Sequence, residues 1–354
     1  MSSWILKSVN LKYILILSLF LVIALSLNAR NAYFSVETAR NGNEFSFPVF
    51  SNLTDNSAAN KINQLLQINE LELLKGYEKE NIFEKVRDSQ IAASGWKKNI
   101  SFEIKNNTNK TLSLKLNESA CISSCSDWIK YYNFNSQNGE IIQLQDLFTE
   151  VGYKRFYELI LGKVAKEFER IIKEAEPGEQ DTYNDIIECY KENITLDFYI
   201  DNKNIYIDGE NCFLINEILP KFSTVSVFKL SVFKQYLNAY GRSVFSLSDD
   251  PVSQFRSMSL PQLFSGEIGE RKVLLVLDKV SGKEVMAEYI DLEYGKGAFM
   301  TGRLDENVLT LSELDNPFAD HTPHINAVYD GIQITGNLIN ETEGINYDVN
   351  LRRK

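Results

Sequence analysis

The sequence lacks the motifs of several common enzyme classes. The glycine pair in GEIGE, residues 266–270, lies between expected strands and has neither the lysine nor the following helix of a phosphate-binding loop. No Gly-x-Ser-x-Gly elbow occurs anywhere in the chain. These absences argue against a P-loop nucleotidase and against a serine hydrolase of the α/β-hydrolase type.

Positive charge is also scarce. The 37 lysines and arginines face 48 aspartates and glutamates, so the net charge is -11. Nucleic-acid binding needs clustered lysine and arginine to neutralise phosphates, whereas both candidate domains of this chain are acidic. We therefore expect no nucleic-acid partner, and the acidity by itself serves solubility.

Histidine is nearly absent. The chain has 2 histidines, His321 and His324, both in the stretch DNPFADHTPH. With Asp315 and Asp320 they could hold a metal, but Pro323 breaks the helix that would place both rings on one side. We expect a polar loop between strands here, with no metal and no cofactor.

Cysteine is limited to 4 residues, the first of them Cys121. No cysteine follows the N-terminal apolar run closely, which excludes a lipoprotein-type anchor. An even number of cysteines in an exported protein favours disulfides over a metal site, and three pairings are possible. The spacing favours Cys121 with Cys125 and Cys189 with Cys212.

One apolar run stands near the N-terminus, from Tyr13 to Leu27, and it follows Lys7 and Lys12. As a helix it would cover about 22 Å, less than the roughly 30 Å of a bilayer core. This length is more typical of a secretory signal than of a spanning helix. Residues 1–32 are therefore a cleaved signal peptide or, alternatively, a retained inner-membrane anchor through residues 13–27. Either reading exports the rest of the chain to the periplasm or the exterior.

Residues 33–245 alternate between strand and helix patterns. A strand is expected around Phe45–Phe50 and a helix capped by Ser57 follows it. Apolar residues then alternate over 100–104 and 112–116, which predicts a hairpin with one buried face. Helical spacing from Tyr153 to Ala175 predicts the longest helix. Helices separate from runs of strands indicate an α+β fold, an antiparallel sheet with packed helices.

The stretch Tyr131–Phe148 organises this first region. It predicts a hairpin with a three-residue loop at 137–139 and with Phe134 opposite Ile142. Asp146 is expected to cap the turn that follows the second strand.

Residues 246–262 are polar and contain Pro251 and Pro261, so we expect a linker there. The remainder, 263–354, shows almost no helical periodicity. It contains eight short alternating segments with glycines between them, which predicts a second, all-β domain, a meander or small barrel. These candidate strands are 263–267, 272–277, 285–289, 298–304, 308–313, 325–329, 333–338 and 346–351.

Residues about 45–240 resemble an extracytoplasmic domain family shared by lysozyme-sensing anti-sigma factors and the N-terminal region of some peptidoglycan deacetylases. The matching stretches are FPVFSN, ANKINQLLQ, YNFNSQNGEIIQLQDLF and ITLDFYIDNKNIYI. Residues about 263–352 look like a small β domain common at the ends of bacterial secreted proteins, through LFSGEIGERKVLLVLD, GAFMTGRLDENVLTLSEL and ITGNL. The resemblance carries over no catalytic residue, because the deacetylases hold their metal in a further domain.

Two functions follow as expectations. The first is an exported, non-catalytic binding protein of the cell envelope, whose acidic surface engages a basic protein such as lysozyme, or a wall glycan. Its membrane contact would be limited to the N-terminal segment, and its partner-facing surface is expected at Ser119–Asp127. The alternative is a wall-polymer hydrolase with a carboxylate pair that the sequence does not identify.

Overall fold

The computed structural model describes residues 32–87, 96–121, 125–176, 178–192, 197–215, 223–248, 260–295, 297–313, 323–340 and 343–354. The predicted signal or anchor segment and most of the expected linker lie outside these residues. Among the helices described, none combines the length and the apolar character needed to span a bilayer.

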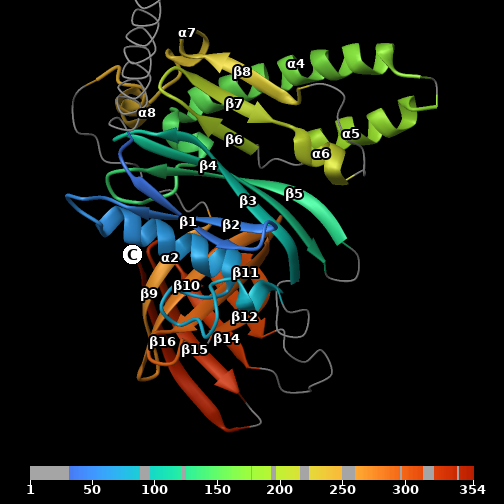
Figure 1. Cartoon of the computed structure of the whole chain (residues 1–354). Helices are drawn as coiled ribbons and strands as arrows, with labels where there is room; N and C mark the ends of the chain where they lie inside the picture. Colours follow the sequence, from blue (N-terminus) through green and yellow to red (C-terminus); the bar gives the residue numbers. More distant parts are fainter. Residues whose placement is uncertain are drawn as a thin grey trace, which may run out of the picture.

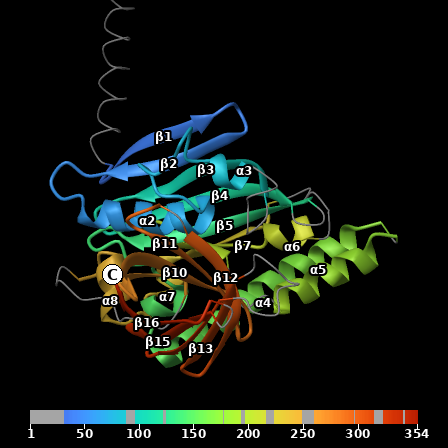
Figure 2. The same ribbon diagram turned by 90° about the horizontal axis from the view of Figure 1, so that it is seen from below.

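The fold is stacked in layers (Figure 1). A small three-stranded sheet with helices α4 and α5 covers one face of a five-stranded sheet, and helix α2 with an eight-stranded barrel covers the other. The α4–α5 pair extends away from the body of the molecule in both views (Figures 1 and 2). The expected α+β fold followed by an all-β barrel is confirmed.

The five-stranded sheet, sheet A, has the order β1-β2-β3-β4-β5. Its strands are β1 (Ser35–Asn41), β2 (Phe45–Ser51), β3 (Trp96–Asn107), β4 (Thr111–Cys121) and β5 (Cys125–Asn135). The long antiparallel β3–β4 hairpin matches the prediction, with Ile104 opposite Leu114. The sheet is not wholly antiparallel, however, because β2 and β3 run parallel where Phe45 lies opposite Ile100. A crossover through α2 separates these two strands in the chain and allows this direction.

Helix α2 (Ser57–Leu71) packs between sheet A and the barrel. Asn56 is its N-cap residue, so Ser57 is the first helical residue and not the predicted cap. The helix ends at Glu72, which adopts a left-handed conformation with φ of 52°. A short helix α3 (Glu84–Arg87) follows. Both sides of α2 are covered, which explains why polar residues such as Gln67 and Glu70 are buried in it.

The predicted hairpin after β5 forms with a different register. Phe134 lies opposite Ile141, not Ile142, and Gly139 N–H donates to the Asn135 carbonyl across a loop at 136–139. Side chains of Asn135 and Asn138 accept hydrogen bonds from backbone N–H groups within this turn, which stabilises the longer loop.

A 3-10 turn, η1 (Leu144–Leu147), replaces the second strand of this hairpin. The Asp146 carboxylate accepts from Gln143 N at 2.9 Å, so it closes the turn that contains it and not the following one. Thr149 caps α4 (Glu150–Glu174) by accepting from Gly152 N at 3.0 Å. The long helix is thus confirmed, with its start three residues earlier than expected.

The small sheet, sheet C, has the order β6-β7-β8. Its strands and the helices around it are β6 (Asp197–Ile200), β7 (Asn204–Asp208), β8 (Val225–Lys229), α5 (Gln180–Glu192), α6 (Glu210–Ile215), α7 (Leu230–Phe233) and α8 (Ala239–Val244). Buried and more exposed residues alternate along these strands. Helix α4 packs its apolar face, with Phe156, Ile160 and Phe168, into the core between the helices and this sheet.

The barrel closes through β9–β16, and all eight predicted strands are confirmed. They are β9 (Gln262–Ile268), β10 (Arg271–Ser281), β11 (Glu284–Asp291), β12 (Gly297–Asp305), β13 (Val308–Glu313), β14 (His324–Tyr329), β15 (Gln333–Asn340) and β16 (Ile345–Arg353). Apolar side chains fill the interior, and Tyr329 hydroxyl reaches Gln262 Oε1 at 2.9 Å inside it. Gly302 allows a close approach of strands, since a Cβ there would lie 1.8 Å from the Thr310 carbonyl oxygen.

The barrel docks on α2 through the outer face of β9–β11. Leu263, Leu274, Val276 and Ile290 belong to the same buried cluster as the apolar residues of α2 and sheet A. The two halves of the chain therefore share one core at their junction. The boundaries at 245 and 263 remain a prediction.

Candidate functional site

The face of sheet A opposite α2 is polar in sequence but is covered by sheet C. Ser113 Oγ donates to the Ile200 carbonyl at 3.0 Å, and Asn133 Nδ2 donates to the Phe198 carbonyl at 2.8 Å. Both Ser113 and Asn133 are buried. The predicted single buried face holds for β3, where Ser101 and Glu103 are exposed, but not for β4, where Ser113 binds the backbone of β6 instead of water.

Three tyrosines form a row where β5, β6 and β7 meet, and we call them the tyrosine strip: Tyr131, Tyr199 and Tyr206. The ring centroids of Tyr131 and Tyr199 are 5.6 Å apart with an interplanar angle of 18°. Those of Tyr199 and Tyr206 are 4.4 Å apart at 5°. All three are half-buried, and Val227 of β8 continues the row to an exposed edge.

The strip is held by charged neighbours. Lys105 Nζ lies 5.5 Å from the centre of the Tyr199 ring, and Lys115 Nζ lies 5.9 Å from that of Tyr131. The Tyr206 hydroxyl donates to Asp201 at 2.7 Å. Burial, followed by the neighbouring Tyr206, raises the pKa of Tyr199 to about 12. The tyrosine hydroxyls are therefore protonated donors near neutral pH.

Two carboxyl groups lie at the end of the strip. Asp197 and Asp208 are direct partners across β6 and β7. The Tyr131 hydroxyl donates to Asp208 Oδ2 at 2.5 Å, and Thr224 Oγ1 donates to Oδ1 at 2.6 Å. Because Asp208 is buried and both its oxygens accept hydrogen bonds, it positions Tyr131 and does not face a substrate.

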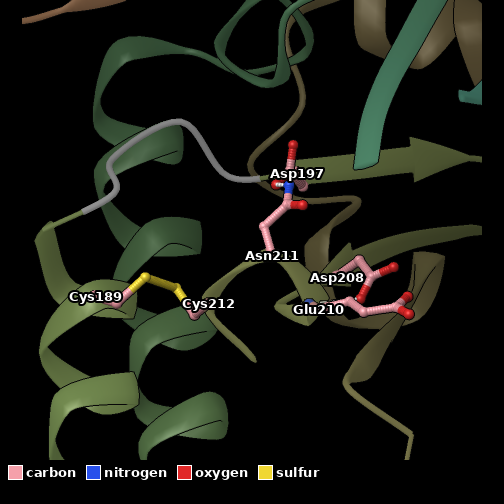
Figure 3. Close-up of a disulfide and its surroundings, with 6 residues drawn as sticks. All are labelled: Cys189, Asp197, Asp208, Glu210, Asn211 and Cys212. Atoms are coloured by element: carbon pink, nitrogen blue, oxygen red, sulfur yellow. Dashed lines mark hydrogen bonds between the residues drawn. A yellow bond between two sulfur atoms is a disulfide. The ribbon is translucent and has the colours of Figure 1, made fainter. Parts of the chain in front are cut away.

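Asp197 has a different environment (Figure 3). Asn211 Nδ2 donates to Asp197 Oδ2 at 2.6 Å, and the same amide group bonds both the N–H and the carbonyl of Ile129 at 2.8 Å. Burial, opposed by the Asn211 hydrogen bond and assisted by the charge of Asp208, raises the pKa of Asp197 to about 7. The pair thus contains one carboxyl that titrates near neutrality, the property expected of a general acid or base.

The predicted disulfide cysteines join in the favoured pairs. Cys189 of α5 bonds Cys212 of α6 beside Asn211 (Figure 3), and Cys121 bonds Cys125 across the ends of β4 and β5. All 4 cysteines of the sequence are thereby used. Two disulfides are typical of an oxidising compartment, which supports a periplasmic or extracellular location.

The remaining predicted residues do not assemble a site among the described residues. His321 lies outside them, and His324 begins β14 opposite Ser312. Within the described ranges, no group of three or more His, Cys, Asp or Glu residues could hold a metal. The expected partner-facing loop at Ser119–Asp127 consists of strand ends, with residues 122–124 outside the described part.

Sequence reasoning missed the tyrosine strip. The signal was available in part, because Tyr131, Tyr199 and Tyr206 each occupy a polar-face position in an alternating strand. Their convergence depends on β6 crossing sheet A, which no local pattern encodes.

Comparisons with known proteins give only distant structural similarity. No family model matches the sequence, and no curated protein matches it. A crystal structure of a DUF3298 family member from Bacteroides fragilis is similar with a TM-score of 0.37 and 12% identity, covering 62% of this chain and 97% of that one. A DUF3298 family protein from Pseudomonas aeruginosa is similar with a TM-score of 0.33 and 9% identity, covering 59% of this chain and 94% of that one. Similarity at this level assigns no family and no activity to the chain.

Proposed function

We propose that this protein is an exported, non-catalytic binding protein of the cell envelope and that it contacts its partner through the tyrosine strip. The observation that carries the proposal is the alignment of three half-buried tyrosines on neighbouring strands of two sheets. Tyrosine is enriched among the residues that dominate binding energy at protein interfaces.

The strip is rigid before any partner arrives. Tyr131 is fixed by Asp208 and Tyr206 by Asp201, and the rings lie on strands and not on a loop. A preorganised contact loses little conformational freedom on binding, which leaves more of the contact energy for affinity.

A basic protein fits this surface better than a wall glycan. The rings face one another in the stack, so few flat faces remain for a sugar ring to cover. The ammonium groups of Lys105 and Lys115 show that cations are accommodated beside these rings. Glu103 beside the strip is already paired with Lys105, so the attraction of a cationic partner rests on the net charge of -11. The resemblance to lysozyme-sensing domains supports lysozyme as the first partner to test.

The test compares two double variants. Tyr199→Ser with Tyr206→Ser removes most of the strip, whereas Tyr294→Ser with Tyr347→Ser removes two exposed tyrosines of the barrel region as a matched control. The purified proteins are titrated with lysozyme at low and high salt. If each strip tyrosine contributes about 2 kcal/mol, its loss weakens binding roughly thirtyfold.

The expected result is salt-sensitive binding by the parent protein and the control, and strongly weakened binding by the strip variant. Absence of salt-sensitive binding, or equal binding by both variants, would overturn the proposal. Binding to insoluble peptidoglycan but not to lysozyme would instead identify a glycan as the partner.

The Asp197 carboxyl supports a second candidate function, hydrolysis of a wall polymer. Its supporting observation is the Asp197 carboxyl with a pKa of about 7. Release of soluble fragments from peptidoglycan, abolished by Asp197→Asn, would establish this activity in place of a purely binding role.

A further inference from the structure

A network of ionisable side chains is buried where the barrel meets α2 and sheet A. Lys97 Nζ of β3 lies 2.9 Å from Glu70 Oε2 of α2 and 2.9 Å from Glu118 Oε2 of β4. Lys130 Nζ of β5 lies 3.0 Å from both carboxylate oxygens of Glu70. The side chains of Glu70 and Glu118 have 0% exposure, and that of Lys97 has 6%. Only Lys130, at 38%, reaches solvent from this group of four.

The barrel contributes two more carboxyl groups. Asp278 of β10 accepts from Asn69 Nδ2 of α2 at 3.4 Å and faces both Lys130 and Glu70. Glu288 of β11 is buried and faces Glu72, Lys85, Lys97 and Glu70. The network therefore bridges the two halves of the chain.

The charges in this network do not balance. Four carboxyl groups, Glu70, Glu118, Asp278 and Glu288, face the two ammonium groups of Lys97 and Lys130, and Glu72 and Lys85 flank Glu288. The buried Tyr132 hydroxyl donates to Glu70 and adds no charge while it is protonated. Excess negative charge in a buried site is costly, so carboxyl groups there retain protons.

The local geometry identifies the carboxyl groups that retain their protons. Glu70 has both lysines, and although burial opposes its ionisation, Lys130 and Lys97 hold its pKa below the usual value. Burial, followed by the charge of Glu70, raises the pKa of Glu118. Burial likewise raises the pKa of Asp278 and, together with Glu72, that of Glu288.

We propose that this network makes docking of the barrel onto α2 and sheet A sensitive to pH, tight while Glu118, Asp278 and Glu288 carry protons and looser when they lose them. The sign follows from linkage. A carboxyl group that holds its proton more strongly in the docked state stabilises docking at low pH and loses that contribution as the pH rises.

Two other contacts would keep the barrel attached while the network opens. The Tyr77 hydroxyl donates to the Leu292 carbonyl of the barrel. At the C-terminal strand, Glu140 binds both Lys61 and Arg353 at 2.6 Å (Figure 2 shows the C-terminal end beside α2). Burial opposes ionisation of Glu140, but its two cationic partners lower its pKa. Glu140 therefore stays ionised, and this contact persists as the pH rises. The opening is therefore local to the buried network.

Hydrogen exchange followed by mass spectrometry tests this inference on the whole protein. Exchange is measured at about pH 5.5 and about pH 9, corrected for the intrinsic pH dependence of amide exchange. From the lower to the higher pH, we expect the protection of amides in α2 and β10 to fall about tenfold more than that of amides in β13 and β14, which lie away from the network. The double variant Glu118→Gln with Glu288→Gln mimics the protonated state and should retain protection at the higher pH.

Two outcomes would overturn the inference: equal changes in α2 and β13–β14, or an unchanged pH response in the double variant. Should the double variant fail to fold, Asp278→Asn at the more accessible edge of the network replaces it. This variant must also retain protection at the higher pH, although to a smaller extent. Asp305→Asn, at an exposed barrel ion pair, is the matched control and should leave the pH response unaltered.

Discussion

Replacing Lys97 by methionine should destabilise the protein strongly. Methionine keeps most of the side-chain volume but removes the ammonium group that lies 2.9 Å from both Glu70 and Glu118. Glu70 would retain Lys130 at 3.0 Å, whereas Glu118 would keep Lys130 only at 4.0 Å. The loss therefore falls mainly on Glu118, which becomes a buried carboxylate without a close cation.

Removing one partner of a buried ion pair costs about 3–5 kcal/mol, and the remaining Lys130 places this case near 3 kcal/mol while Glu118 is ionised. Urea unfolding followed by circular dichroism measures the effect. With a slope of roughly 2–3 kcal/mol per molar urea, the midpoint should fall by about 1–1.5 M. The cost should shrink as the pH falls and Glu118 takes up its proton, because the neutral carboxyl has no charge for Lys97 to compensate.

A second substitution separates charge from packing. Glu118→Gln in the Lys97→Met background removes the stranded charge and should recover at least about 1 kcal/mol of the lost stability. A single-variant loss below about 1 kcal/mol, or a double variant less stable than the single one, would refute the view that charge compensation holds this junction together.

Three further predictions concern separate parts of the molecule. Asp197→Asn should reduce the loss of folding stability between about pH 4 and pH 7. Burial raises the pKa of Asp197 from 3.8 to about 7, so the protonated carboxyl stabilises the fold at low pH and that stabilisation is lost across this window. Thermal unfolding measured over this pH range checks the prediction. Gly139→Ala should lower the free energy of unfolding by about 2 kcal/mol, since φ is +69° and the new Cβ would lie 2.7 Å from the Ala58 carbonyl oxygen. An unchanged midpoint of urea unfolding would contradict this prediction. Replacing Cys189 and Cys212 by alanine opens a loop with a sequence separation of 23 and should lower stability by about 3 kcal/mol under oxidising conditions, with no loss when both parent and variant are measured in reductant.

Local sequence patterns were sufficient where one physical rule decides the structure. The eight barrel strands follow alternation of apolar and polar residues, because every second side chain points into the barrel. The long helix follows from an apolar stripe at helical spacing. The disulfide pairs followed from spacing and number.

The patterns failed where a residue has more than one satisfactory partner. The hairpin after β5 slipped by one residue because Asn135 and Asn138 stabilise a longer turn than the position of the glycine suggested. Ser113 and Asn133 have polar side chains that could equally have faced water, and only the crossing of β6 buries them.

The sequence by itself thus determined an acidic protein with an α+β part and a small barrel, because composition and periodicity report charge and element type. Only the tertiary structure decided which charges and rings meet. Glu70, Lys97, Glu118 and Glu288 are far apart in the chain, and their network exists because α2, sheet A and the barrel share one buried junction. The tyrosine strip exists for the same reason: three strands from two sheets bring its rings together, and contacts between separate elements are not written in any local pattern.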